Sequence, residues 1–205
     1  MKSEPSPVTA LVLAGARAGL DPVAEVAGVP LKVLALVGGM PMVSRVLMVL
    51  EASSLVERRV LCGPSWEVVQ EQNVLRDLVN TKTIQWVAIP LRPCPSVHRN
   101  LEQHHQDFIL RVITADHALL TVEMVEYFLR EAGQTQADVA VALVPYSVVA
   151  EAYPQSKRTV IRFQGGGYCG CNLFFLGTPR ASRLVDFWSQ VERERKQPFR
   201  LIRRL

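Results

Sequence analysis

The chain has 205 residues, of which 49% are hydrophobic and 20% are charged. This composition excludes a disordered, collagen-like or coiled-coil chain, and the length predicts a single domain over residues 1–205. The formal net charge is +4, but residues 178–205 hold eight basic and three acidic residues and therefore carry +5. The rest of the chain carries about −1, which excludes a nucleic-acid-binding body and leaves only the C-terminal segment cationic.

Neither a membrane span nor a targeting segment is visible in the sequence. No apolar run reaches the roughly 18 residues that a transmembrane helix needs, and Met1–Pro7 does not resemble a signal peptide. The four cysteines, at positions 62, 94, 169 and 171, include one close pair, whose spacing is poor for zinc. We expect reduced thiols in a cytoplasmic protein without a transmembrane segment.

Over the first 145 or so residues, expected strands alternate with expected helices. Short apolar runs predict buried strands at Thr9–Ala14, Arg59–Cys62, Ile84–Ile89, Phe108–Thr114 and Asp138–Val144, with a further apolar run at Val33–Val37. Helical spacing and start signals predict helices at Pro41–Leu50, Ser65–Val79 and Val97–Gln106 and another after Thr121. This alternation indicates βαβ units, and therefore a mostly parallel sheet with helices on both faces.

Beyond residue 145 the expected strands follow one another without helices between them. Tyr146–Ser156 has no regular pattern, and the strands Arg158–Phe163 and Asn172–Leu176 flank a glycine turn. We therefore expect a three-layer α/β/α fold whose twisted, mostly parallel central sheet has a small antiparallel extension near 158–176. The basic segment 178–205 has a helical apolar stripe and no terminating signal. We expect it to pack as a helix on the body or on a second copy of the chain; the alternative is that the natural chain continues beyond Leu205.

A long segment, Gly15–Leu31, separates the first strand from the next apolar run. It has no apolar periodicity, and such loops are usually functional or disordered. We expect it to be mobile alone and ordered by a ligand. Gly15 allows a turn whose backbone amides can hold a phosphate, although an ordinary strand-to-loop turn would look the same. The segment contains neither a Walker loop nor a complete G-x-G-x-x-G motif.

Two charged residues sit where an α/β sheet binds ligands. Asp116 follows the strand Phe108–Thr114, and ligands bind at the carboxyl ends of such strands. Its carboxylate is either an unpaired metal ligand or a simple turn aspartate, and His117 is expected to be structural. Lys32 follows the long loop and either reaches polyphosphate oxygens or lies solvated on the surface.

A second group of candidates lies late in the chain. The adjacent cations Lys157 and Arg158 precede a glycine-dense stretch that ends at Asn172. Neighbouring cations can bind an anionic substrate, and glycines let the backbone approach it closely. An edge-strand charge pair followed by a hairpin turn would give the same pattern.

Together these features resemble the MobA-like nucleotidyltransferases, which have the glycosyltransferase-A type fold. The similarity covers Thr9 to about Leu176 and is strongest in the stretches Ala10–Gly15, Lys32–Leu50 and Val112–Leu120. It implies transfer of a nucleoside monophosphate from an NTP to a phosphorylated small-molecule acceptor, with release of pyrophosphate. It also implies a requirement for Mg²⁺ or Mn²⁺.

The resemblance assigns roles to particular residues. Lys32 and Asp116 would be catalytic, and Asp116 and Asn172 would hold the metal. The NTP would be bound by Leu13, Ala14, Gly15, Ala16, Arg17 and Lys32, with Ser96 and Asn100 near the base or ribose. Lys157 and Arg158 would orient the acceptor.

The sequence departs from the family pattern at several positions. The family usually has a second glycine where Ala16 stands, an arginine where Leu20 stands and a proline shortly after the metal-binding aspartate, where His117-Ala118 follow Asp116. These changes favour an alternative, a non-catalytic relative that binds nucleotide or a partner protein. A Rossmann dehydrogenase fits worse, because the loop lacks the third glycine and no acidic residue ends the second strand. Neither the NTP base nor the acceptor can be read from the sequence.

Overall fold

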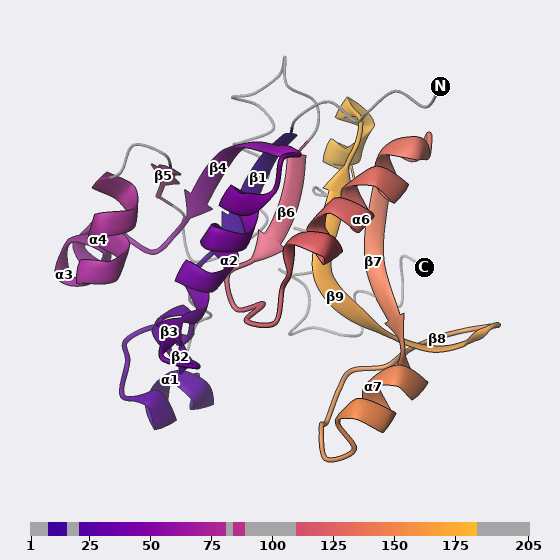
Figure 1. Ribbon diagram of the computed structural model, residues 1–205, viewed down its shortest axis with the longest axis horizontal. Helices are drawn as coiled ribbons and strands as arrows, with labels where there is room; N and C mark the ends of the chain where they lie inside the picture. The colour runs from indigo at the N-terminus through magenta and orange to yellow at the C-terminus, as the bar shows by residue number, and fades with distance from the viewer. Residues whose placement is uncertain (1–7, 16–20, 81–83, 89–109, 184–205) are drawn as a thin grey trace, which may run out of the picture.

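A computed structural model of the chain describes residues 8–15, 21–80, 84–88 and 110–183. The main sheet of this part has seven strands in the order β5-β4-β1-β6-β9-β7, with β8 paired to β9 (Figure 1). The strands are β1 (Val8–Leu13), β4 (Val56–Cys62), β5 (Ile84–Val87), β6 (Leu110–Thr114), β7 (Val139–Pro145), β8 (Ile161–Phe163) and β9 (Gly166–Leu176).

The sheet is mixed, as the sequence predicts. Strands β5, β4, β1 and β6 pair in parallel, whereas β9 runs antiparallel to β6 on one side and to β7 on the other. Strands β8 and β9 lie in the expected region near 158–176, but β7, at Val139–Pro145, precedes this region and also pairs antiparallel. However, β9 lies inside the sheet, between β6 and β7, and β8 pairs with β9 outside this order of strands.

Helices and short elements surround this sheet. They are α1 (Pro22–Ala27), α2 (Met42–Ala52), α3 (Trp66–Glu71), α4 (Asn73–Asn80), α6 (Val122–Gln134), α7 (Tyr146–Ala152), the 3₁₀ turns Lys32–Leu34 and Pro179–Ala181, and the small hairpin β2 (Leu36–Val37) and β3 (Met40–Pro41). Helices α2 and α6 lie side by side over one face of the sheet (Figure 1). The helix expected at Val97–Gln106 and the basic segment from residue 184 onward lie outside the described residues. No described helix is long and apolar enough to cross a membrane.

The core explains why the first strand reads as a continuous apolar run. Val8, Ala10 and Val12 of β1 belong to the cluster under α2 and α6, whereas Leu11 belongs to a second cluster on the opposite face. Because β1 is central and buried on both faces, every position along it favours an apolar residue.

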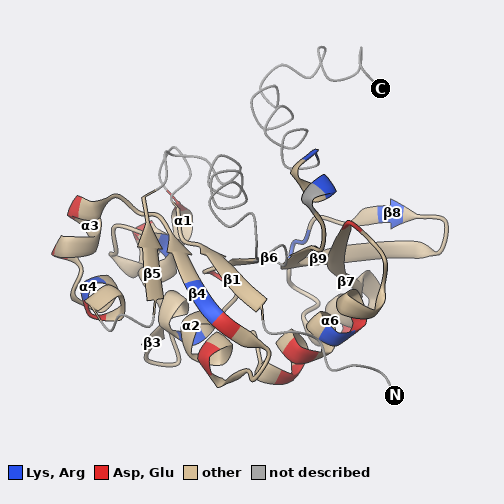
Figure 2. Ribbon diagram, turned by 90° about the horizontal axis from the view of Figure 1, so that it is seen from above, with Lys and Arg blue, Asp and Glu red and all other residues tan. Residues whose placement is uncertain are grey.

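Strand β4 changes from exposed and charged at its start to buried and apolar at its carboxyl end. Its first half carries the exposed Glu57 and Arg58, visible as coloured bands in Figure 2, and its second half, Val60–Cys62, is buried. The carboxyl end of this strand is therefore embedded in the protein, next to the carboxyl end of β1.

Two segments expected to be irregular contain helices. Within the long loop, Asp21 caps α1 by accepting hydrogen bonds from Val23 N at 2.9 Å and Ala24 N at 3.4 Å, and Gly28 ends it at φ +63°. After β7, helix α7 begins at Tyr146 and buries none of its residues. Both helices are too short, and α7 too exposed, to show an apolar period.

Three other expectations need correction. The helix expected at Ser65–Val79 is two helices, with the break at Gln72. The expected buried strand Asp138–Val144 is the half-exposed edge strand β7, because it stands last in the strand order. The strand expected from Arg158 begins only at Ile161, so Lys157 and Arg158 precede it.

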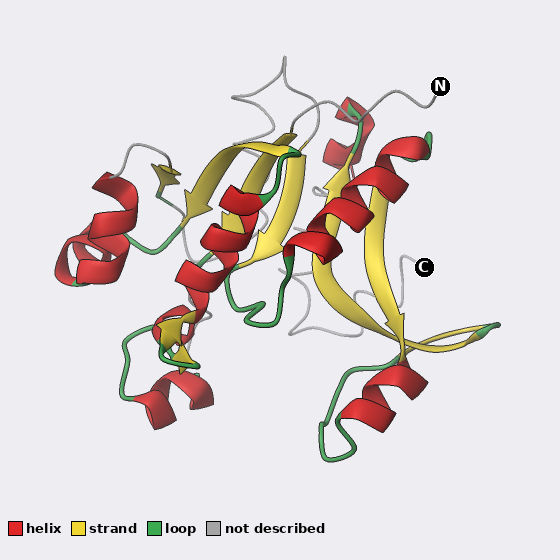
Figure 3. Cartoon of the chain, viewed as in Figure 1, coloured by secondary structure: helices red, strands yellow, loops and turns green. Residues whose placement is uncertain are grey.

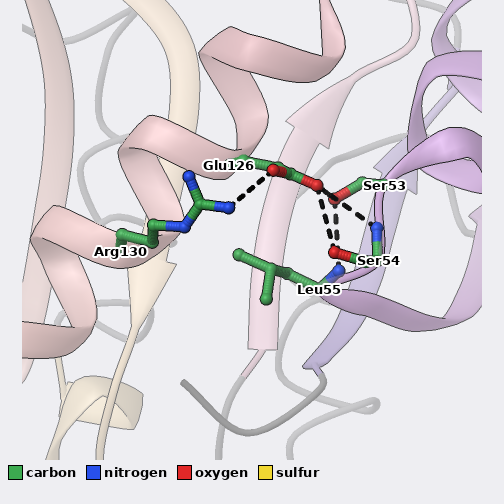
Figure 4. A network of polar contacts seen from close by, with 5 residues as sticks. All are labelled: Ser53, Ser54, Leu55, Glu126 and Arg130. Atoms are coloured by element: carbon green, nitrogen blue, oxygen red, sulfur yellow. Dashed lines mark hydrogen bonds and ion pairs between the residues drawn. The ribbon is translucent and has the colours of Figure 1, made fainter. Parts of the chain in front are cut away.

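A polar network ties α6 to the turn between α2 and β4 (Figure 4). Glu126 Oε1 accepts hydrogen bonds from Ser53 Oγ at 3.4 Å and from the amide and hydroxyl of Ser54 at 3.3 Å each. Its other oxygen pairs with Arg130 at 2.8 Å. One carboxylate thus joins two helices at the N-terminal end of β4.

Replacing Glu126 by alanine is expected to lower the free energy of unfolding by about 1–2 kcal/mol, because several donors lose their acceptor. Urea denaturation of the variant and of Arg130→Ala measures this effect. The arginine variant loses only an exposed ion pair and should change stability by less than about 0.5 kcal/mol. Equal losses of unfolding free energy in both variants would show that the hydrogen bonds from Ser53 and Ser54 to Glu126 do not contribute to stability.

Candidate functional site

The carboxyl ends of β1, β4 and β6 meet at one edge of the sheet, from which loops leave (Figure 3). Hydrogen bonds hold these ends in register beyond the last strand residues. The Ala14 amide donates to the Cys62 carbonyl at 2.8 Å, and the Ala115 amide donates to the Leu13 carbonyl at 2.9 Å. The stretch Leu13–Gly15 therefore has a defined position between two neighbouring strands.

The turn at Gly15 is packed against a second glycine. Gly63 has φ +79°, and a Cβ atom placed on it would lie 3.1 Å from both N and Cα of Gly15. Its amide also donates to the Val87 carbonyl at 3.0 Å. The end of β4 thus supports the glycine turn through a backbone contact so close that a side chain at Gly63 would have to push the turn away. In the sequence, Gly63-Pro64 marks only the end of a strand.

The structure brings together the two residues expected to be catalytic. Lys32 Nζ lies 2.7 Å from Asp116 Oδ2, within a hydrogen-bonded ion pair. Lys32 begins the 3₁₀ turn that follows α1, and Asp116 lies in the turn after β6. The side chains are 35% and 27% exposed, so the pair opens to solvent at the sheet edge. The expectation that this carboxylate is unpaired is therefore wrong.

Electrostatics keep Asp116 ionised and His117 neutral at neutral pH. Burial raises the pKa of Asp116, but the hydrogen bond from Lys32, further hydrogen bonds from Thr114 and the backbone, and the charge of Lys32 together hold the pKa below its ordinary value. Burial lowers the pKa of His117, with a smaller contribution from the charge of Arg158, against the opposing charge of Asp116. The His117 Nδ1 atom is buried and has no hydrogen-bond partner in the described part of the chain.

Asn172 occupies an unusual backbone position at the same edge. It has φ +56°, in the left-handed region. The pairing of β6 with β9 ends at Ile113 opposite Leu173, next to Asn172. On the other side of β9, the register with β7 shifts by a bulge between Val141 and Leu143. Such bulges redirect side chains and are frequent next to active sites. The sequence, which suggested only the start of a strand here, does not reveal this conformation.

Because of this backbone, Asn172→Gly and Asn172→Ala are expected to differ. Glycine keeps the left-handed conformation, so stability should hardly change, whereas alanine should cost about 1–2 kcal/mol. If the amide is a metal ligand, both variants bind Mg²⁺ with NTP more weakly, which calorimetry at several metal concentrations measures. Unchanged metal dependence in Asn172→Gly would remove this residue from the metal site.

Arg158 lies near these residues, although it precedes β8. Its charge lowers the pKa of His117 and also acts on the Cys171 thiol, whose pKa burial raises overall. Lys157 is exposed on the same connecting segment. The predicted nucleotide contacts Ala16, Arg17, Ser96 and Asn100 lie outside the described residues.

The donors present suit a hard cation. In the described ranges, no cluster of three His, Cys, Asp or Glu side chains could hold a metal. A metal at this edge would have to rely on the Asp116 carboxylate, with an amide, phosphate oxygens and water as further ligands. This oxygen-rich, water-sharing set is typical of Mg²⁺.

Comparison with known protein structures supports the fold. A structure described as a hypothetical transferase from Thermus thermophilus is 27% identical, with a TM-score of 0.73 over 96% of this chain and 77% of that chain. A 4-diphosphocytidyl-2C-methyl-D-erythritol synthase from Anaerococcus prevotii is 9% identical, with a TM-score of 0.62 over 90% and 76% of the two chains. A CMP:2-keto-3-deoxy-manno-octonic acid synthetase complexed with CTP is 13% identical, with a TM-score of 0.58 over 97% and 86%.

A search of curated proteins finds no match to this sequence. The family model of the MobA-like NTP transferase domain, in contrast, matches residues 10–161. This range contains the glycine turn, Lys32 and Asp116, the three features that meet at the carboxyl edge of the sheet. The chain therefore belongs to the MobA-like NTP transferase domain family.

Proposed function

We propose that the protein transfers a nucleoside monophosphate from an NTP to a phosphorylated small-molecule acceptor and releases pyrophosphate. The observation that carries this proposal is the contact between Lys32 and Asp116 at the edge where the glycine turn ends β1. A cation for phosphate oxygens and a carboxylate for a metal are groups that phosphoryl transfer uses, and the glycine turn beside them gives the backbone room to approach a triphosphate.

The chemistry needs no covalent contribution from the protein. An acceptor oxygen attacks the α-phosphorus in line, the bond to the bridging oxygen of pyrophosphate breaks, and the leaving group carries away the negative charge. Lys32 would bind oxygens of the leaving pyrophosphate, the Gly15 turn would hold the triphosphate, and Arg158 with Lys157 would orient the acceptor anion. Mg²⁺ bound by Asp116 and Asn172 would neutralise charge on the reacting phosphates.

The test begins with nucleotide binding. Thermal unfolding is measured with ATP, CTP, GTP and UTP, each with and without Mg²⁺. A ligand at about 100 times its Kd stabilises the folded state by about 2.7 kcal/mol, so the preferred base stands out. Pyrophosphate release is then measured with that NTP and a panel of sugar phosphates and phosphorylated cofactor precursors.

The outcomes separate catalysis from binding alone. Binding without pyrophosphate release for any acceptor would support the non-catalytic alternative, which the replacement of the usual glycine by Ala16 favours. No stabilisation by any of the four nucleotides would contradict both nucleotidyl transfer and nucleotide binding, and would favour a relative that binds only a partner protein.

Gly15→Ala provides a specific probe of the nucleotide site. Gly15 is exposed, and no atom lies within 4 Å of a Cβ placed on it. The substitution should therefore leave the free energy of unfolding unchanged or raise it by about 0.4–1 kcal/mol. If the turn holds the triphosphate, stabilisation by NTP should fall strongly in the same variant. Retention of the full nucleotide-induced shift would place the triphosphate elsewhere.

A further inference from the structure

The contact between Lys32 and Asp116 places two binding roles on one carboxylate group, since Asp116 already accepts the Lys32 ammonium and would also have to bind the metal. Asp116 Oδ2 accepts the Lys32 ammonium at 2.7 Å, while a magnesium ion would bind a carboxylate oxygen at about 2.0–2.1 Å. A metal that binds Asp116 must therefore displace the ammonium or sit beside it against charge repulsion. The positive charge on Lys32 thus opposes the entry of a free cation.

The surrounding structure allows the ammonium to move without moving the backbone. Leu31 and Val33, on either side of Lys32, are 8% and 6% exposed, so the chain is anchored there. Ala115, next to Asp116, is fully buried. The long lysine side chain is about one third exposed and can leave the carboxylate by rotating about its own bonds.

The charges at this edge favour a polyanion over a free metal ion. Lys32 neutralises Asp116 through their ion pair at 2.7 Å, and Arg158 adds a positive charge nearby. A triphosphate brings several negative charges that can attract Lys32 away from the carboxylate while it carries the metal to that position.

We propose that Lys32 makes the site selective for the metal–triphosphate complex and prevents Asp116 from binding the metal alone. Lys32 then acts in two places, on Asp116 before the complex binds and on phosphate oxygens afterwards. This inference rests on the proposed function, because it takes Asp116 as the metal ligand and an NTP as the substrate.

The direct test is a titration with metal alone. Binding of Mn²⁺ is followed by electron paramagnetic resonance for the wild type, for Lys32→Met and for Arg130→Met. Methionine keeps the unbranched shape of the lysine side chain and lacks only its terminal ammonium. The Arg130 variant removes one positive charge from the distant ion pair with Glu126. Lys32→Met should bind Mn²⁺ about tenfold more tightly than the wild type, whereas Arg130→Met should not differ from it.

A second measurement uses inorganic triphosphate, which avoids the choice of base. Thermal shifts are recorded with Mg²⁺ alone and with Mg²⁺ and triphosphate together. The melting temperature of the wild type should rise only with the mixture. That of Lys32→Met should rise with Mg²⁺ alone, and triphosphate should no longer stabilise this variant. Lys32→Gln is measured in parallel as a polar replacement of similar size.

Two results would overturn the inference. One is an affinity of Lys32→Met and Lys32→Gln for Mn²⁺ alone that is equal to or weaker than that of the wild type. The other is retention of the tighter Mn²⁺ binding after Asp116→Asn is added to Lys32→Met, because the metal would then bind elsewhere. Failure of the proposed function would give a different result, namely a wild type that binds no NTP. The Mn²⁺ affinities of the wild type and Lys32→Met can still be compared in that case.

Discussion

Replacing Asp116 by asparagine is expected to lower the rate of nucleotidyl transfer by about 10²–10³, a loss typical of removing one transition-state stabilising group. The substitution keeps the size of the side chain and removes the charge that would hold the metal. Steady-state measurement of pyrophosphate release, at saturating NTP and over a range of Mg²⁺ concentrations, separates a lower turnover from weaker metal binding. A variant with unchanged turnover would exclude Asp116 as the metal ligand.

The same substitution should alter stability in a pH-dependent way. The pKa of Asp116 is lower in the folded protein than its ordinary value, because its hydrogen bonds, the one from Lys32 foremost, and the charge of Lys32 together outweigh the effect of burial. Its ionised form therefore stabilises the fold at pH values above the ordinary, unfolded-state pKa, and this contribution is lost as the pH falls through the lower folded-state pKa. Urea unfolding of the wild type and Asp116→Asn should differ slightly at pH 7 and converge in acid, since the ion pair is partly exposed.

Gly63→Ala is expected to lower the free energy of unfolding by about 2–4 kcal/mol. An alanine at φ +79° costs about 1–2 kcal/mol, and its Cβ atom would lie 3.1 Å from backbone atoms of Gly15, which adds an overpacking cost of similar size. Because the clash involves the glycine turn itself, NTP binding should weaken as well. Chemical denaturation and the nucleotide-induced thermal shift measure the two effects.

Gly39→Ala is the matched control for this experiment. Gly39 has almost the same backbone conformation, with φ +77°, but no atom lies within 4 Å of a Cβ placed there. It should therefore show the conformational cost alone, about 1–2 kcal/mol, with nucleotide binding intact. If Gly63→Ala and Gly39→Ala behaved alike, the contact between Gly63 and Gly15 would be unimportant for both stability and binding.

Local patterns in the sequence were sufficient for the parallel part of the sheet. Strand β1 is buried on both faces and therefore shows a nearly continuous apolar run, and the glycine and aspartate that follow β1 and β6 mark their carboxyl ends. Because parallel strands align those ends at one edge, the sequence alone indicated where ligand-binding residues should gather. The short helices α1 and α7 were missed, since six or seven residues show too little of an apolar period.

Only the tertiary structure decided which side chains meet at that edge. Lys32 and Asp116 are 84 residues apart, and no local pattern encodes their contact or the resulting lower pKa of the carboxyl group. The packing of Gly63 on Gly15 depends likewise on the neighbouring positions of β1 and β4. The insertion of β9 between β6 and β7 places Asn172 at the end of β6, where it has a left-handed conformation beside the register shift between β9 and β7. These features arise from long-range packing and strand pairing, which composition and periodicity do not specify.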